Sequence, residues 1–211
     1  MSERSTARAL VREAGTTYAE QAGIALADKP SPLYRLLVLS VLLSTRIKAE
    51  IAVSAARELG EFPTAERMRD ATWQQRVDAL GRGHYVRYDE STATALGRGA
   101  ELVLDRYRGD LRRMRAAADG DPAEVQRLLR EVPSLGPVGA HIFCREAQAV
   151  WPELRPHFDQ KALSGAEKAG LPADAHRLAE LVPADDCARF SAALVRITLE
   201  KGLLREITAS A

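Results

Sequence analysis

Residues 131–143 read EVPSLGPVGAHIF, and this stretch decides how the whole chain is interpreted. It holds Pro133, Gly136, Pro137 and Gly139, which are enough turn-forming residues to end any helix. Apolar runs typical of helices precede and follow it. The stretch therefore predicts two helices joined by a very tight turn.

The backbone of this turn is suited to an anion. Gly136 and Gly139 have no Cβ, so the chain could approach another group closely at these positions. Leu135 is expected to be buried beneath the turn. The N–H groups of Gly136, Val138 and Gly139 would then lie at the N-terminus of the second helix, where unpaired donors and the helix dipole attract a phosphate.

The composition is that of an ordinary globular protein, with 46% hydrophobic and 28% charged residues among 211. A formal charge of +1 neither favours nor excludes nucleic acid, because only the distribution of charge decides that. The longest apolar run, residues 36–44, is shorter than the roughly 20 residues that span a bilayer. The chain starts with polar residues, so we expect a cytoplasmic protein without a membrane partner.

The sequence predicts an all-α fold, because no segment alternates with the period of a strand. Candidate N-caps are Ser31 before Pro32, Thr64, and Asp121 before Pro122. Gly60 is expected to end one helix, and Gly81 and Gly83 to open a loop. The helices are expected at residues 5–26, 32–44, 48–59, 62–72, 73–80, 88–107, 122–131, 139–150, 160–169, 173–181 and 185–203, with a looser segment at 109–121.

Residues 128–143, LLREVPSLGPVGAHIF, resemble a helix-hairpin-helix motif, and their surroundings resemble the endonuclease III type of DNA glycosylase. Three further segments follow that family's order: LLVLSVLLSTRIKAE (36–50), GHYVRYDESTATAL (83–96) and HFDQKAL (157–163). The resemblance covers residues 30–170. It implies one two-lobed domain with a cleft, lobe 1 at residues 32–141 and lobe 2 at 1–27 plus 142–211.

The resemblance also implies how the hairpin would act. Such enzymes take a base out of the duplex, and phosphate contacts position the protein while this happens. Ser134, Gly136, Val138 and Gly139 would grip the backbone of double-stranded DNA. Ser134 stands where the family has its first hairpin glycine, which is a departure from the usual hairpin geometry.

Two other segments would contact DNA on the same resemblance. Arg46 matches the position whose side chain fills the space left by the base, and His84, with Tyr85 beside it, matches the position that wedges into the opposite strand. Alternatively, Arg46 is a solvated loop cation, and His84 and Tyr85 pack within their own loop.

Asp159 matches the catalytic aspartate of the family. Cleavage of a glycosidic bond builds positive charge on the sugar. A nearby carboxylate can stabilise this charge, or it can position the water that attacks the sugar. Asp159 also stands where it would cap a helix, and that role needs no catalysis.

Val138 occupies the position of the lysine that gives some family members lyase activity. Valine cannot form a Schiff base, so the resemblance implies a monofunctional glycosylase. Lys161 stands where the family has a histidine, and it is a surrogate nucleophile, a phosphate contact or a surface lysine. A lysine nucleophile would need burial or a cationic neighbour.

The expected cofactor set is empty. Cys187 alone cannot hold the iron–sulfur cluster of many family members, and Cys144 lies far from it in sequence. The resemblance leaves open whether carbonyl groups of the hairpin bind a monovalent cation. Trp73 and Trp151 are expected in the core or between lobes. The arginines of DRYRGDLRRMR (105–115) form either a solvated helix end or a DNA-facing patch.

The leading function is therefore base excision from DNA by a monomeric, nucleoid-associated glycosylase that hydrolyses the N-glycosidic bond with Asp159. One alternative is a bifunctional enzyme with lyase activity at Lys161. The other is a catalytically silent protein that binds DNA structure through the hairpin. No motif specifies the base.

Overall fold

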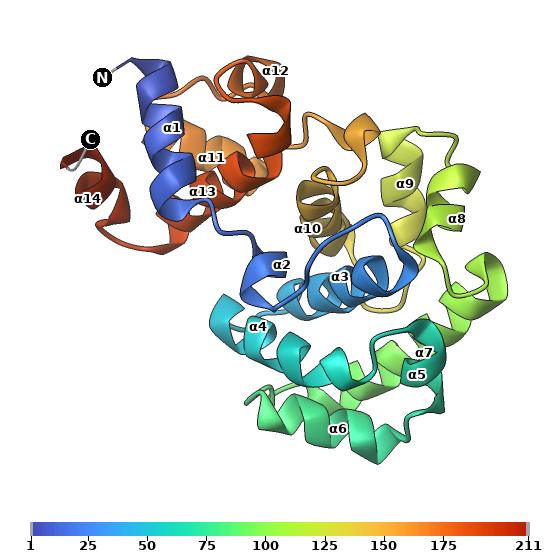
Figure 1. The fold of residues 1–211 in the computed structure, drawn as a ribbon. Coiled ribbons are helices and arrows are strands. Elements are labelled where there is room, and N and C mark those ends of the chain that lie inside the picture. Colours follow the sequence, from blue (N-terminus) through green and yellow to red (C-terminus); the bar gives the residue numbers. More distant parts are fainter. Residues whose placement is uncertain (1, 210–211) are drawn as a thin grey trace. The chain divides into compact units, whose positions relative to one another are not determined.

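The computed structural model describes residues 2–209, and every regular element among them is a helix, which confirms the all-α fold (Figure 1). Short 3-10 turns occur at Leu59–Glu61, Pro152–Leu154 and Ala184–Asp186. The α-helices are α1 Glu3–Ala14, α2 Tyr18–Gln21, α3 Pro30–Leu43, α4 Ala49–Glu58, α5 Ala65–Asp70, α6 Trp73–Arg82, α7 Asp89–Tyr107, α8 Leu111–Ala117, α9 Pro122–Leu129, α10 Pro137–Ala147, α11 Gln160–Lys168, α12 Ala175–Ala179, α13 Cys187–Leu199 and α14 Leu203–Ala209.

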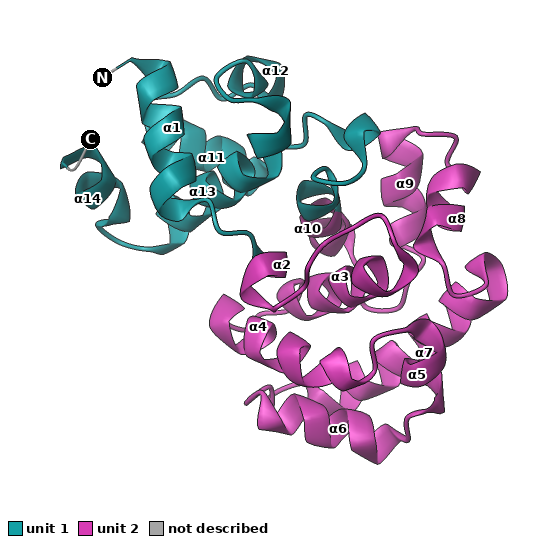
Figure 2. Cartoon of the chain, in the orientation of Figure 1, with its two compact units in different colours: residues 1–18, 144–211 teal, residues 19–143 magenta. Residues whose placement is uncertain are grey.

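The chain forms two compact units (Figure 2). Unit 1 combines residues 1–18 with 144–211, and unit 2 is the continuous segment 19–143. The boundary at Phe143 falls inside α10, so this helix begins in unit 2 and ends in unit 1.

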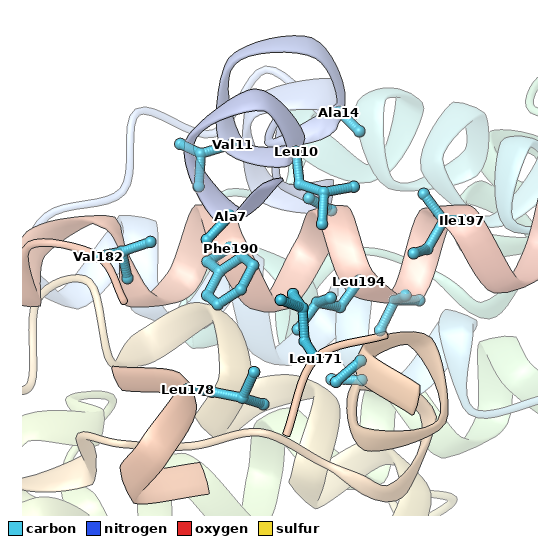
Figure 3. Close-up of a cluster of buried hydrophobic side chains, with 14 of the residues drawn as sticks. Ala7, Leu10, Val11, Ala14, Leu171, Leu178, Val182, Phe190, Leu194 and Ile197 are labelled. Carbon is cyan, nitrogen blue, oxygen red and sulfur yellow. The ribbon is translucent and has the colours of Figure 1, made fainter. Parts of the chain in front are cut away.

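Unit 1 is built around α13, against which α1 and α11 both pack. Leu10 of α1 and Phe190 and Leu194 of α13 are fully buried in this core (Figure 3). Helices α11 and α13 approach very closely at Gly165, where a Cβ would lie 2.0 Å from the Leu194 carbonyl oxygen. Only glycine allows this approach.

Unit 2 is organised by α3 and α7. The apolar helix α3 is buried along most of its length and packs on α4 and α8, while α5 and α6 pack on α7. The buried guanidinium of Arg76 donates to the carbonyls of Met68, Ala71 and Ala93 at 2.9, 2.6 and 2.9 Å. These bonds tie α5 and α6 to α7.

Two of the helix caps expected from the sequence are confirmed. Thr64 accepts from Arg67 N at 3.3 Å, and Asp121 accepts from Ala123 N at 2.9 Å. The cap at Ser31 was wrong, because α3 begins at Pro30 after Lys29, whose side chain makes no capping bond. Proline at the first helical position starts this helix two residues before the predicted one.

Several helix boundaries inside long predicted segments were also wrong. The expected helix 5–26 is interrupted after Ala14, where Gly15 is the C-cap. The segment 109–121 contains the regular helix α8, which Asp110 caps. The expected helix 185–203 ends at Leu199, and Gly202, with φ of 92°, separates it from α14. Gly60 lies in a 3-10 turn and Gly81 inside α6, so neither glycine has its predicted place.

Candidate functional site

The turn between α9 and α10 has the tight geometry that its sequence predicts. Leu129 ends α9, Pro137 begins α10, and Leu135 N donates to Val132 O at 3.0 Å. Ser134 adopts a left-handed φ of 63°, and Leu135 is 2% exposed. The chain therefore reverses over a buried leucine, as expected.

The start of α10 presents backbone donors to solvent. The first main-chain bond of this helix joins Ala140 N to Gly136 O at 3.0 Å. The N–H groups of Gly136, Val138 and Gly139 find no main-chain acceptor within residues 2–209. Gly136 and Val138 are exposed, and a Cβ added at Gly136 would meet no atom within 4 Å. An anion could approach the donors of Gly136 and Val138 without displacing protein atoms, whereas Gly139 is buried.

The two hairpin glycines have different roles. A Cβ at Gly139 would lie 2.6 Å from Leu135 Cδ1 and 3.0 Å from Ser44 Cβ. Gly139 is buried, so its missing side chain makes room for the protein's own packing. The close approach expected at Gly139 is thus made by the protein's own Leu135 and Ser44, while a phosphate contact at Gly136 and Gly139 stays a prediction.

Hydrogen bonds connect the hairpin with the two other segments predicted to contact DNA. The Ser44 hydroxyl lies 3.1 Å from Ser134 O, and the Thr45 hydroxyl shares a 2.8 Å hydrogen bond with the Tyr85 hydroxyl. All three segments belong to unit 2. We call residues 44–48, 83–88 and 130–139 the three-loop cluster.

Arg46 and His84 are exposed in this cluster, as a DNA contact requires, and His84 has a left-handed φ of 62°. Tyr85 is different, because it is fully buried and its hydroxyl is bonded to Thr45. A buried ring cannot wedge into DNA, so the prediction for Tyr85 was wrong. Its role is to hold the loop at 83–88 against the loop at 44–48.

The three-loop cluster carries more basic than acidic side chains. Arg46, Lys48, Arg87 and Arg130 are exposed, and none forms an ion pair with any described residue. The segments 44–48 and 83–88 contain no carboxylate. Glu131 is the acidic residue of the cluster, and it is paired with Arg106 and Arg127.

The arginines of residues 105–115 are largely occupied elsewhere. Arg106 pairs with Glu131, Arg112 with Asp110 at 2.7 Å, and Arg115 with Asp28 at 3.1 Å. The Arg112 contact lowers the pKa of Asp110 below its usual value. These pairs favour a solvated helix end over a DNA-facing patch.

Asp159 caps α11 in unit 1, as predicted. Its Oδ1 accepts from Ala162 N at 2.9 Å. Its Oδ2 accepts from Arg145 Nη1 at 2.6 Å, and the two side chains are 10% and 3% exposed respectively. The carboxylate is therefore held at both oxygens.

Arg145 is itself surrounded by partners from three positions in the chain. Its Nε lies 4.0 Å from Glu146 Oε1, and its guanidinium carbon lies 5.7 Å from the centre of the Tyr18 ring. Tyr18 N also donates to Glu146 Oε1 at 3.4 Å. The buried group combines two carboxylates with one guanidinium.

Gln148 fixes the chain that leads to Asp159. Its Nε2 donates to Arg145 O at 3.0 Å and to His157 O at 2.8 Å, and its Oε1 accepts from His157 N at 2.9 Å. None of the site residues expected from the sequence was Arg145, Glu146 or Gln148. A signal existed, since HIFCREAQAVW places these polar residues within an apolar helical run.

Lys161 is exposed on the first turn of α11. It does not have the burial that would favour a lysine nucleophile. The two tryptophans differ, because Trp151 is fully buried, as expected, whereas Trp73 is 41% exposed and donates to Thr94 Oγ1 at 3.1 Å. The prediction of a core position for Trp73 was wrong.

No three His, Cys, Asp or Glu side chains gather as metal ligands in residues 2–209. Within the same residues, no helix is long and apolar enough to cross a membrane.

No family model matches the chain, and no curated protein matches it. Among solved structures, the chain is similar to the endonuclease III of a trapped covalent endonuclease III–DNA intermediate, the estranged-adenine complex. The alignment covers 92% of this chain and 85% of that chain, with 13% identity and a TM-score of 0.49.

Proposed function

We propose that this chain binds double-stranded DNA through the three-loop cluster and excises a damaged or modified base by hydrolysing its N-glycosidic bond. The observation that carries the proposal is the connection of the three predicted DNA-contacting segments by the Ser44–Ser134 and Thr45–Tyr85 hydrogen bonds. These bonds join segments that are 90 and 40 residues apart in sequence, and each of the three segments carries an exposed cation.

The hairpin would supply the phosphate contact. Unpaired N–H groups at the start of α10 attract an anion, and the exposed Arg46, Lys48 and Arg87 add the charge that holds a nucleic acid backbone. His84 and Val86, on either side of Tyr85 in the loop 83–88, are exposed, and Val86 is 66% exposed. An exposed apolar side chain on a loop suits insertion between base steps.

Asp159 would supply the chemistry. As the base leaves, positive charge develops on the sugar, and a fixed carboxylate stabilises this charge or orients the attacking water. A carboxylate has about four lone-pair sites, so the bonds from Ala162 and Arg145 leave acceptor capacity on both oxygens. With Val138 in place of lysine, the reaction uses water as the nucleophile.

One alternative is favoured by a specific observation. Asp159 caps α11 and pairs with a buried arginine, and both interactions would keep the residue in a protein that only binds DNA. A catalytically silent binder of DNA structure is therefore the second candidate. A lyase using Lys161 is less favoured, since this side chain is exposed.

The test is a screen for base release from duplexes that carry oxidised, alkylated or deaminated bases, with abasic duplexes included to detect strand cleavage. We expect release from at least one duplex and its loss in Asp159→Asn, with DNA affinity retained. Binding without release from any duplex would support the silent binder. Borohydride trapping on abasic DNA that is lost in Lys161→Ala would support the lyase.

The hairpin contact has its own test. Gly136→Asp puts a negative charge at the exposed donors and should weaken duplex binding, whereas Gly136→Ala adds only a methyl group into open space. Ala116→Asp makes the same charge change at an exposed residue of α8 in unit 2 and serves as the control. Equal affinity of the two aspartate variants would exclude a phosphate at the hairpin.

A further inference from the structure

The least expected feature of unit 1 is the burial of Arg145. A guanidinium taken out of water loses more free energy than most ion pairs return, so packing alone would favour an apolar residue at this position. The side chain is nevertheless 3% exposed, and its Nε makes no hydrogen bond with any described residue. The charge is therefore kept although the protein does not satisfy it completely.

Within residues 2–209, the one hydrogen bond of the Arg145 side chain goes to the Asp159 carboxylate. Nη1 donates to Asp159 Oδ2 at 2.6 Å, and the Tyr18 ring lies against the guanidinium. Gln148 binds both the Arg145 carbonyl and the backbone of His157, two residues before Asp159. Arg145 of α10 thus holds the Asp159 side chain, and Gln148, just after α10, holds the chain that precedes Asp159.

We propose that Arg145 is the positioning residue of Asp159, and that Glu146 offsets its charge. This inference rests on the proposed function, in which Asp159 is the catalytic residue. Arg145 fixes the carboxylate in one orientation before DNA binds. Its guanidinium does not need to touch the substrate.

Glu146 matters because a simple arginine–aspartate pair is neutral. Such a pair would attract a positively charged sugar only weakly. Glu146 Oε1 lies 4.0 Å from Arg145 Nε, and an ionised Glu146 would add a second negative charge beside the guanidinium that binds Asp159. At low dielectric this charge acts strongly on a cation that forms nearby.

The enzymatic test compares Arg145→Lys, Arg145→Met and Glu146→Gln on a duplex from which the wild-type protein releases a base. For Arg145→Met we expect kcat to fall about 100-fold, as for other misplaced catalytic groups, with unchanged KM and DNA affinity. Arg145→Lys should recover part of the loss, and Glu146→Gln should lower kcat without affecting DNA affinity. Full kcat in folded Arg145→Met, when Asp159→Asn is inactive, would overturn the inference and leave the proposed function intact.

A second measurement does not depend on activity. The Ala162 amide is bonded to Asp159 Oδ1, and the Arg177 amide is bonded in the same way to Asp174 Oδ1, at 2.9 Å in both cases. Both amides lie in unit 1, so a general loosening of this unit would accelerate hydrogen exchange at both. If Arg145 positions Asp159, Arg145→Met accelerates exchange at Ala162 alone.

Equal exchange of Ala162 in the wild-type protein and in Arg145→Met would overturn the inference, as would equal acceleration at Ala162 and Arg177. If Arg145→Met does not fold because two buried carboxylates lose their partner, Arg145→Met with Glu146→Gln removes one of these charges and is measured instead. If Asp159→Asn still releases the base, the proposed catalysis fails, and the exchange rates alone decide whether Arg145 positions Asp159.

Discussion

Gly165→Ala should loosen the contact between α11 and α13, and with it the helix that Asp159 caps. The new Cβ would lie 2.0 Å from the Leu194 carbonyl oxygen and 2.7 Å from the Leu194 carbonyl carbon. These are backbone atoms of a buried helix, so a change of rotamer cannot relieve the clash. The two helices would have to separate.

The magnitude follows from two opposing effects. Overpacking of a core costs about 1–3 kcal/mol, and a clash with backbone belongs at the upper end of that range. Replacing glycine by alanine inside a helix returns about 1 kcal/mol. The net loss is about 2 kcal/mol, which for a unit of fewer than 100 residues lowers Tm by about 10 °C.

The two tryptophans allow each unit to be observed separately. Trp151 is buried in unit 1 and Trp73 lies in unit 2, so in a Trp73→Phe background the fluorescence of Trp151 reports unit 1. Gly81→Ala in α6 of unit 2 controls for the glycine-to-alanine change itself, because a Cβ there would meet no atom within 4 Å, and it is read from Trp73 in a Trp151→Phe background. An unchanged unfolding midpoint of Trp151 in Gly165→Ala would refute the close contact of α11 and α13.

Three further outcomes are expected. Arg46→Ala should weaken DNA binding and reduce the dependence of log Kd on log salt by about one unit, whereas Arg106→Ala, whose guanidinium is paired, should leave this slope unchanged. Tyr85→Phe should cost about 1 kcal/mol of the free energy of unfolding of unit 2, measured by urea denaturation, because the bond to the Thr45 hydroxyl is lost. Burial raises the pKa of the Cys144 thiol from 9.0 to about 12, so a thiol reagent at pH 8 should modify Cys144 only after unfolding. Because the unfolded chain loses this proton at a lower pH than the folded protein, the free energy of unfolding should fall as the pH rises from 9 towards 12.

Local chemistry explains which parts of the fold could be predicted from the sequence. Thr64, Asp121 and Asp159 cap helices through bonds to residues two or three positions away, so the sequence contains the whole interaction. The helices predicted at 5–26 and 185–203 were too long, because helix-forming composition does not show where tertiary packing ends a helix. Gly15 and Gly202 mark those ends, and each is a single residue within a helical composition.

The candidate site was predictable only where its residues share a turn. The hairpin from Val132 to Gly139 is local, and its shape follows from its sequence. The burial of Tyr85 depends on Thr45, and the environment of Asp159 depends on Arg145 and Tyr18. Such contacts join residues up to 127 positions apart, and no periodicity in the sequence reports them.

The discontinuity of unit 1 has a consequence during synthesis. Unit 2 is one continuous segment, so it can fold as soon as residues 19–143 have left the ribosome. Helix α1 is made first, but Ala7, Leu10 and Val11 pack against α13, which begins only at Cys187. The apolar face of α1 therefore stays exposed to solvent, or bound by a chaperone, while unit 2 folds. This exposure makes α1 the segment of the nascent chain most prone to misassembly.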